Sequence, residues 1–153
     1  ILSSLEKLHL TIKKLDLKII DKSNYLKLNH KEGIPIEGVK NLQNNLFGLE
    51  SNFEELKAID FKKGCYVGQE NTARMKLKNK IRRKLFPIIS KNYLKISNEI
   101  KFDNKVVGKV LIDGAYPFAL IKLFDPNFSK FYKKNLKVNE TDIQILVPSY
   151  FKI

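Results

Sequence analysis

The sequence predicts an α+β protein in which helices and loops precede a small antiparallel β-barrel. Two observations lead to this fold class. Before about residue 79, apolar residues recur at the spacing of an amphipathic helix or give way to loops rich in Gly and Asn. After residue 79, short β-rich runs follow one another closely. This change of period places a boundary at Asn79, between a domain of residues 1–79 and a domain of residues 80–153.

The first helix is expected from about residue 4 to residue 16. Ser3 and Glu6 form the Ser-x-x-Glu pattern of a capping box, whose side chains satisfy backbone N–H groups at a helix start. Apolar residues then recur at helical spacing, at Leu5, Leu8, Ile12 and Leu15. Such a stripe usually faces the core, so we expect this helix to pack there.

A second helix is expected to end at Gly33. Either Asp21 or Ser23 can cap its start, and Pro35 prevents its continuation. Residues 36–51 are rich in Gly and Asn, which predicts a loop with one short turn of helix.

The β-rich runs after residue 79 are expected as short strands. Turn signals lie at Asp103-Asn104 and at Asp113-Gly114, and Pro87 implies an edge or a bulge in the first strand. The expected strands are 80–89, 94–96, 100–102, 106–112, 115–124 and 143–147. Strands this short and close together are typical of an antiparallel barrel or sandwich.

The basic composition does not by itself indicate a nucleic-acid partner. The formal net charge is +13, but only three of the 29 basic residues are arginine, the better bidentate ligand of phosphate. Few aromatic residues are interleaved with the lysines for base stacking. We therefore expect a solvated lysine surface that favours anionic ligands and binds no nucleic acid.

The cysteine and histidine content and the lengths of the apolar runs bear on the location of the protein and on metal binding. The chain has one cysteine, which fits a reducing compartment, and no apolar run approaches the ~20 residues that span a bilayer. These features predict a cytoplasmic location away from membranes. The only histidines are His9 and His30, which with one cysteine do not make a zinc site.

The segment Lys62–Met75 carries the chemistry. It holds the only cysteine, Cys65, between Gly64 and Gly68. The residues after Gly68 favour helix, so Cys65 lies just ahead of a helix N-terminus with Lys63 nearby. This setting favours the thiolate form of a cysteine. The alternative interpretation is that Cys65 is a small buried hydrophobe, as free cysteines often are.

Two charged residues follow in the same predicted helix. Glu70 falls in the first turn, where a carboxylate complements the helix dipole. Arg74 comes four residues later on the same face, so the two side chains can pair.

The motif resembles the signature of the YgfZ family, which contains folate-binding proteins of iron–sulfur cluster maturation. The matching residues are Lys63, Gly64, Cys65, Tyr66, Gly68, Gln69, Glu70 and Arg74. The wider superfamily includes the aminomethyltransferase (T-protein) of glycine cleavage, which has Asp in place of the cysteine. Cys65 therefore favours the YgfZ branch.

The resemblance implies a fold, a cofactor and partners. Residues 1–79 correspond to the C-terminal part of a folate-binding T-protein-like domain, and residues 80–153 to the β-barrel that follows it, so the chain is expected to be the C-terminal half of such a protein or a natural truncation. Cys65 is then the functional thiol and Lys63 its electrostatic activator. The implied contacts to tetrahydrofolate are Tyr66, Gln69, Glu70 and Arg74. The implied partners are iron–sulfur client proteins.

A second family element matches only in part. Gly33 and Pro35 fit the pattern Arg-x-Glu-Ala-Gly-x-Pro, but Asn29 and Lys31 stand in place of its Arg and of the Glu that helps to hold the pterin. Glu50, upstream of the motif, is expected to give support behind the site at most. Two other functions remain open: a one-carbon transferase of the T-protein type, and a basic domain that binds RNA or another protein.

Overall fold

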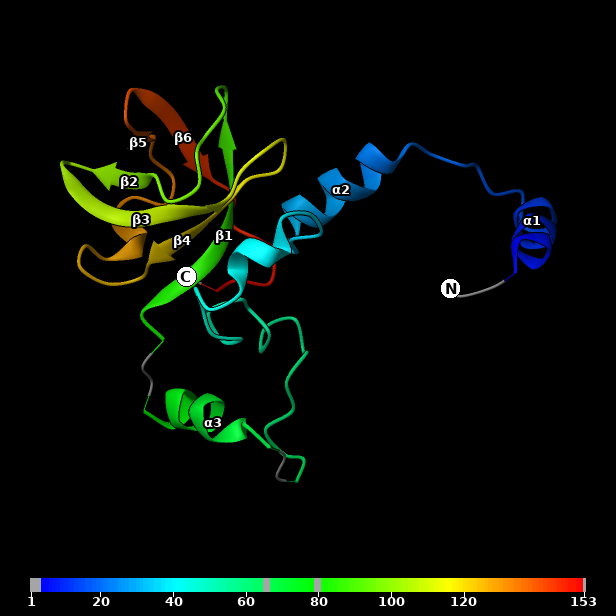
Figure 1. The fold of residues 1–153 in the computed structure, drawn as a ribbon, viewed down its shortest axis with the longest axis horizontal. Coiled ribbons are helices and arrows are strands. Elements are labelled where there is room, and N and C mark those ends of the chain that lie inside the picture. Colours follow the sequence, from blue (N-terminus) through cyan, green and yellow to red (C-terminus); the bar gives the residue numbers. More distant parts are fainter. Residues whose placement is uncertain (1–3, 65–66, 79–80, 153) are drawn as a thin grey trace.

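The computed structural model describes residues 4–64, 67–78 and 81–152. In these residues, three α-helices precede a closed barrel of six antiparallel strands in the order β1-β4-β3-β2-β5-β6 (Figure 1). The expected α+β class and the expected antiparallel barrel are confirmed. The boundary expected at Asn79 lies outside the described residues.

The helices are α1 (Leu5–Lys14), α2 (Lys22–Lys31) and α3 (Gln69–Leu77), with short 3-10 turns η1 (Val39–Leu42) and η2 (Phe128–Lys130). The strands are β1 (Arg83–Ser90), β2 (Glu99–Phe102), β3 (Lys105–Ile112), β4 (Phe118–Lys122), β5 (Leu136–Val138) and β6 (Thr141–Ile145).

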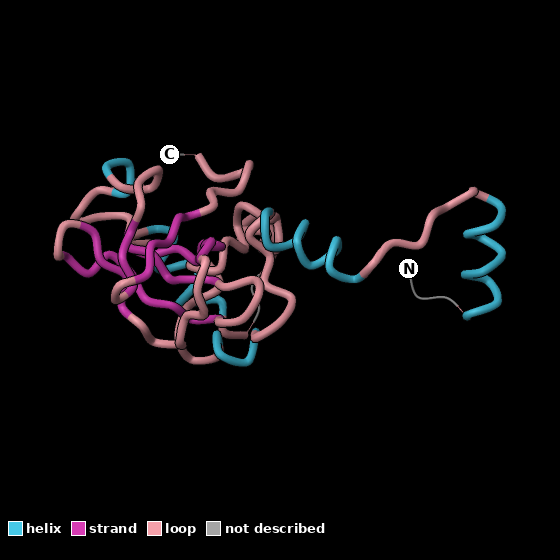
Figure 2. Tube along the Cα trace, turned by 90° about the horizontal axis from the view of Figure 1, so that it is seen from above, coloured by secondary structure: helices cyan, strands magenta, loops and turns pink. Residues whose placement is uncertain are grey.

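The first helix forms where expected, but its packing differs. Ser4 caps α1 by accepting a hydrogen bond from the Lys7 backbone N–H; the expected cap, Ser3, lies outside the described residues. The prediction that the apolar stripe is core is wrong, because Leu5 is 72% exposed and Leu15 is 60% exposed. The physical reason is visible in Figures 1 and 2: α1 stands away from the barrel beyond an extended connection, so no apolar surface of the described chain covers it.

The second helix is fixed at both ends. Asp21 caps α2 by accepting a 2.7 Å hydrogen bond from the Ser23 backbone N–H. The helix ends before Gly33, which has a φ of +70°. A Cβ at Gly33 would lie 2.7 Å from both the Pro148 Cγ and the Tyr150 hydroxyl oxygen, so glycine lets the C-terminal residues pack closely on the end of α2.

Strand β1 is not the edge strand that Pro87 suggested as one of two possibilities, because the barrel is closed and has no edge. It pairs with β4 over Arg83–Pro87 and with β6 over Ile88–Ser90. Pro87 lies where the pairing passes from one neighbour to the other, and its carbonyl accepts a 2.9 Å hydrogen bond from the Leu146 N–H. The Ile88 N–H donates to the Pro117 carbonyl at 3.0 Å, so the bonds on either side of the missing donor are made.

One strand prediction is wrong, and one strand was not predicted. Residues 94–96 form no strand: the chain turns there, with a φ of +69° at Ser97, and Leu94 is buried as a loop residue. Strand β5 was not predicted, because three residues carry too little alternation to signal a strand.

Three of the barrel strands, β1, β3 and β4, bury residues on both of their faces, whereas the other three expose one face. Neighbouring residues on a strand point to opposite faces, and Phe86 belongs to the cluster inside the barrel while Leu85 belongs to a second cluster. The second cluster is Leu85, Leu111, Ile112, Phe118 and Leu120, with Leu42 and Leu46 packed against it. The loop that follows α2 therefore rests on the outer face of β1, β3 and β4, and this contact positions the segment that carries the motif.

Candidate functional site

The described residues of the motif belong to a loop and to the start of α3. Cys65 and Tyr66 lie outside the described residues. Lys63 is exposed in the loop, and Gly68 precedes α3 with a left-handed φ of +85°. Gln69 is the first residue of α3 and is half-buried. The predicted order of loop and then helix N-terminus is confirmed for the described residues.

The structure places Glu70 and Arg74 on α3 but does not pair them. Both side chains are exposed, and none of the ion pairs in the described ranges joins them. An exposed pair at this spacing contributes only about 0.3–0.5 kcal/mol, so little holds the two together. The helix is attached instead by Lys76, which pairs with Glu54 and lies 5.7 Å from the centre of the Phe61 ring.

Glu50 joins the segment before the motif to the strand after it. Its carboxylate is buried and accepts from Arg83 twice, from Nε at 2.9 Å and from Nη2 at 3.3 Å. The Phe47 backbone N–H donates to the same carboxylate at 3.0 Å. This bidentate arrangement is the geometry that arginine provides and lysine does not.

Backbone contacts complete this junction. The Leu85 N–H donates to the Glu50 carbonyl at 2.8 Å, and the fully buried Asn52 amide donates to the Leu85 carbonyl at 2.8 Å. We call Glu50, Asn52, Arg83 and Leu85 the clamp. The clamp holds the two ends of the segment from residue 53 to residue 82 at one place on the body of the protein, and the motif lies within this segment, which we call the excursion.

Sequence reasoning assigned Glu50 a supporting position but missed its partner. A signal was present: in a chain with 29 basic residues, only three are arginine, and Arg83 is one of them. An arginine kept among so many lysines points to a site that needs two parallel N–H donors.

Burial and nearby charges also determine the pKa of the Tyr150 hydroxyl, which lies beside the clamp. Burial raises the pKa of the Tyr150 hydroxyl to about 12, and the negative charges of Glu55 and Glu32 act in the same direction. Its neighbour Ser149 donates a 3.2 Å hydrogen bond to the Glu32 carboxylate. The C-terminal residues thus connect the end of α2 with the region of the clamp.

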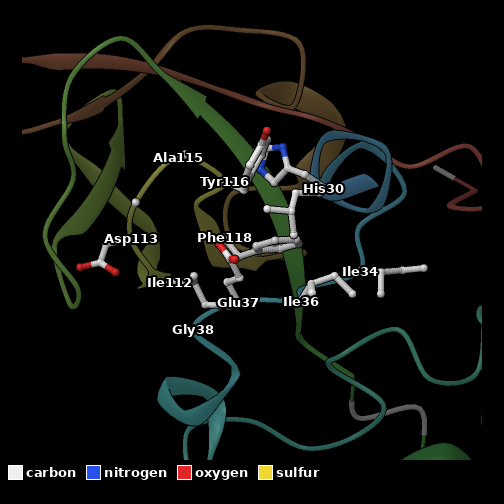
Figure 3. Close-up of a pocket in the computed structure, with 12 residues that line it drawn as sticks. His30, Ile34, Ile36, Glu37, Gly38, Ile112, Asp113, Ala115, Tyr116 and Phe118 are labelled. Carbon is white, nitrogen blue, oxygen red and sulfur yellow. The ribbon is translucent and has the colours of Figure 1, made fainter. Parts of the chain in front are cut away.

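A small cavity of about 180 Å³ lies beside α2 and has a mixed lining, with apolar side chains such as Ile34 and Phe118 and the carboxylates Glu37 and Asp113 (Figure 3). His30 closes one side: its Nε2 lies 2.9 Å from the Pro117 carbonyl oxygen, and its ring meets Phe118 edge-on at 5.1 Å between centres. Burial lowers the pKa of His30 below its usual 6.5. The imidazole is therefore neutral at pH 7 and donates from Nε2, since a carbonyl can only accept.

This lowered pKa predicts a pH dependence of stability. Below pH 6.5, His30 takes up a proton in the unfolded chain more readily than in the folded protein. The neutral ring therefore makes its full contribution to the free energy of unfolding above pH 6.5. That contribution is lost as the pH falls toward the lowered pKa of His30 in the folded protein. His30→Gln keeps a donor for Pro117 but does not titrate. From about pH 7.5 to about pH 5, we expect urea unfolding to show a larger loss of stability in the wild type than in His30→Gln. Equal losses in both proteins would contradict this.

The described parts of the chain contain neither a candidate metal site nor a membrane-spanning helix. No group of three or more His, Cys, Asp or Glu side chains there could hold a metal ion. None of the helices described is long and apolar enough to cross a membrane.

Comparison with known proteins gives partial matches. No protein-family model matches the chain. It is 43% identical over 70 residues to the mitochondrial iron–sulfur cluster assembly factor IBA57 homolog of Dictyostelium discoideum, covering 45% of this chain and 17% of that protein. It is 44% identical over 69 residues to mouse IBA57, covering 44% of this chain and 19% of that protein. The homolog of Pyricularia oryzae is 28% identical over 109 residues, covering 71% of this chain and 28% of that protein.

These relatives correct one prediction and support another. Each of them is named as a mitochondrial protein, which contradicts the expected cytoplasmic location. The chain spans less than a third of the length of these relatives. Over the matched part, the chain is homologous to mitochondrial iron–sulfur cluster assembly factors.

Proposed function

We propose that this chain acts in iron–sulfur cluster assembly in the mitochondrion, as the part of a YgfZ-type factor that carries the cysteine motif. The observation that carries the proposal is the 43% identity over 70 residues to an iron–sulfur cluster assembly factor. The motif from Lys63 to Arg74 supports the same branch. In this proposal Cys65 is the working thiol, and Lys63 with the N-terminus of α3 favours its thiolate form.

The proposal is tested by complementation with the complete gene product. A strain that lacks its mitochondrial assembly factor should recover the activity of an iron–sulfur enzyme when this protein is supplied. A mitochondrial enzyme without a cluster, measured in the same extract, is the control for general mitochondrial damage. Iron–sulfur activity that stays at the level of the empty vector, with the protein present at normal amounts, would reject the proposal.

Tetrahydrofolate is the proposed cofactor, with Tyr66, Gln69, Glu70 and Arg74 as contacts. The described members of this set do not enclose a ligand by themselves. Glu70 and Arg74 are exposed on α3, and neither they nor Gln69 line the cavity beside His30. The described part of the chain therefore offers an open surface at these residues, and a folate site requires further walls.

We therefore expect the isolated chain to bind tetrahydrofolate weakly or not at all. The nitrogen donors of a buried pterin need acceptors, and each one left unpaired costs roughly 1–3 kcal/mol. Lys31, which stands where the family has Glu, cannot accept. Calorimetric titration of the isolated chain and of the complete gene product measures this difference. Micromolar binding by the chain alone would show that the site has been misplaced.

A further inference from the structure

A second, larger groove lies between α2 and the barrel. Its volume is about 690 Å³, within the range of small-molecule sites. Ile89, Pro117 and Leu146 give it an apolar floor. His30 and Tyr116 lie against each other and line both this groove and the smaller cavity (Figure 3).

Positive charge converges on this groove without a matching acid. Lys27 and Lys31 lie four residues apart on α2, hence on one face, and Lys91 approaches from the end of β1. No carboxylate is among the lining residues, and no ion pair within the described ranges involves these three lysines. By contrast Lys22, on the same helix, pairs with Glu37 at 2.9 Å.

The aromatic walls of the groove are held in place by their polar ends. The Tyr116 hydroxyl donates to the Ser23 carbonyl at 3.2 Å, and the Tyr93 hydroxyl donates to the Asp113 carboxylate at 2.6 Å. Asp113 is therefore paired with Tyr93, a wall of the groove, although Asp113 is not itself a lining residue. Both rings offer apolar surface to the groove, and both hydroxyls already have a hydrogen-bond partner within the protein.

We propose that this groove binds a small amphipathic anion. An aromatic or aliphatic body rests on Ile89 and Leu146 between the two tyrosines, and a carboxylate is held by Lys27, Lys31 and Lys91. The reasons are size, an apolar floor and three lysines without an acid. This site does not include the motif on α3. Lys31 also stands where the family has the pterin-holding Glu, but the proposal is tested by the binding of an anion to this groove and not by support of iron–sulfur enzymes.

Three probes of one shape test the proposal on the complete gene product: 1-naphthoate, the neutral 1-naphthalenemethanol and the cationic 1-naphthylmethylamine. Titration followed by NMR should show saturable binding of 1-naphthoate, at least about tenfold tighter than the alcohol, with the amine weakest. Tenfold corresponds to about 1.4 kcal/mol. Equal affinities for the three probes would overturn the proposal.

Substitutions of two lysines test whether 1-naphthoate binds in this groove. Lys31→Glu should weaken 1-naphthoate at least about tenfold, a change of about 1.4 kcal/mol, whereas Lys31→Arg should retain most of the affinity. Lys130→Glu changes the net charge equally at an exposed position outside the groove and should have little effect. Lys31 is also exposed, so its variants should fold, which circular dichroism checks. Affinity that is the same in Lys31→Glu and wild type, or that falls equally in Lys130→Glu, would overturn the assignment.

Discussion

Cys65→Ser in the complete gene product is expected to abolish its support of iron–sulfur enzymes. Serine keeps the size of the side chain but removes a good nucleophile and a soft metal ligand. Its folding and its folate affinity should stay close to those of the wild type, because no bulk or charge is added. The measurement is complementation under oxidative stress, scored by the activity of an iron–sulfur enzyme.

Companion variants make this result interpretable. Lys63→Ala should give a weaker form of the same defect, since it alters only the electrostatic setting of the thiol. Lys78→Ala, at an exposed position just after α3, is the matched control and should be silent. An aminomethyltransferase would respond in the opposite way, with Cys65→Ser nearly without effect. Full rescue by Cys65→Ser would remove Cys65 as the working residue.

The largest effect on stability is expected from Glu50→Ala. The change leaves the Phe47 N–H and two donors of Arg83 without their acceptor, in a place where the carboxylate is 4% exposed. Breaking a buried ion pair costs about 3–5 kcal/mol; the side chain of Arg83 is 41% exposed, so we expect roughly 3 kcal/mol. Chemical denaturation measures the free energy of unfolding.

Two variants control for the loss of a carboxylate as such. Glu99→Ala removes an exposed carboxylate whose pairing with Lys101 is at 4.0 Å, and should change stability by less than about 0.5 kcal/mol. Glu50→Gln keeps one acceptor oxygen and should fall between Glu50→Ala and the wild type. If Glu50→Ala were no more harmful than Glu99→Ala, the clamp would not be a source of stability.

The turns and helix caps could be predicted from the sequence because they depend on local chemistry. Asp103 and Asn104 have φ values of +47° and +62°, the left-handed pair that a two-residue hairpin requires and that these residue types tolerate. Asp21 caps α2 and Gly68 precedes α3 for equally local reasons. Each of these features depends on a few neighbouring residues, so one sequence is enough to read it.

Features that depend on distant partners could not be predicted. The apolar stripe on α1 has helical spacing, but whether something covers it depends on the rest of the molecule. The contact of Glu50 with Arg83 joins residues 33 positions apart. The amphipathic groove likewise takes its lysines from α2 and from the end of β1, and no spacing along the chain brings Lys31 and Lys91 together. The roles of Cys65, Lys63 and the tetrahydrofolate contacts stay predictions.

The clamp also has a consequence for how this protein can change over evolutionary time. Because both ends of the excursion of residues 53–82 are fastened to one point of the barrel, the barrel does not depend on the excursion's length. Doubling the length of a closed loop adds only about 0.6 kcal/mol of closure entropy. Insertions, deletions and new sequences after Glu55, whose carboxylate pairs with the buried Lys84, and before Arg83 can therefore be tried at small cost to the barrel. The segment that carries the motif could therefore take a different sequence, and with it a different chemistry, while the same scaffold is inherited.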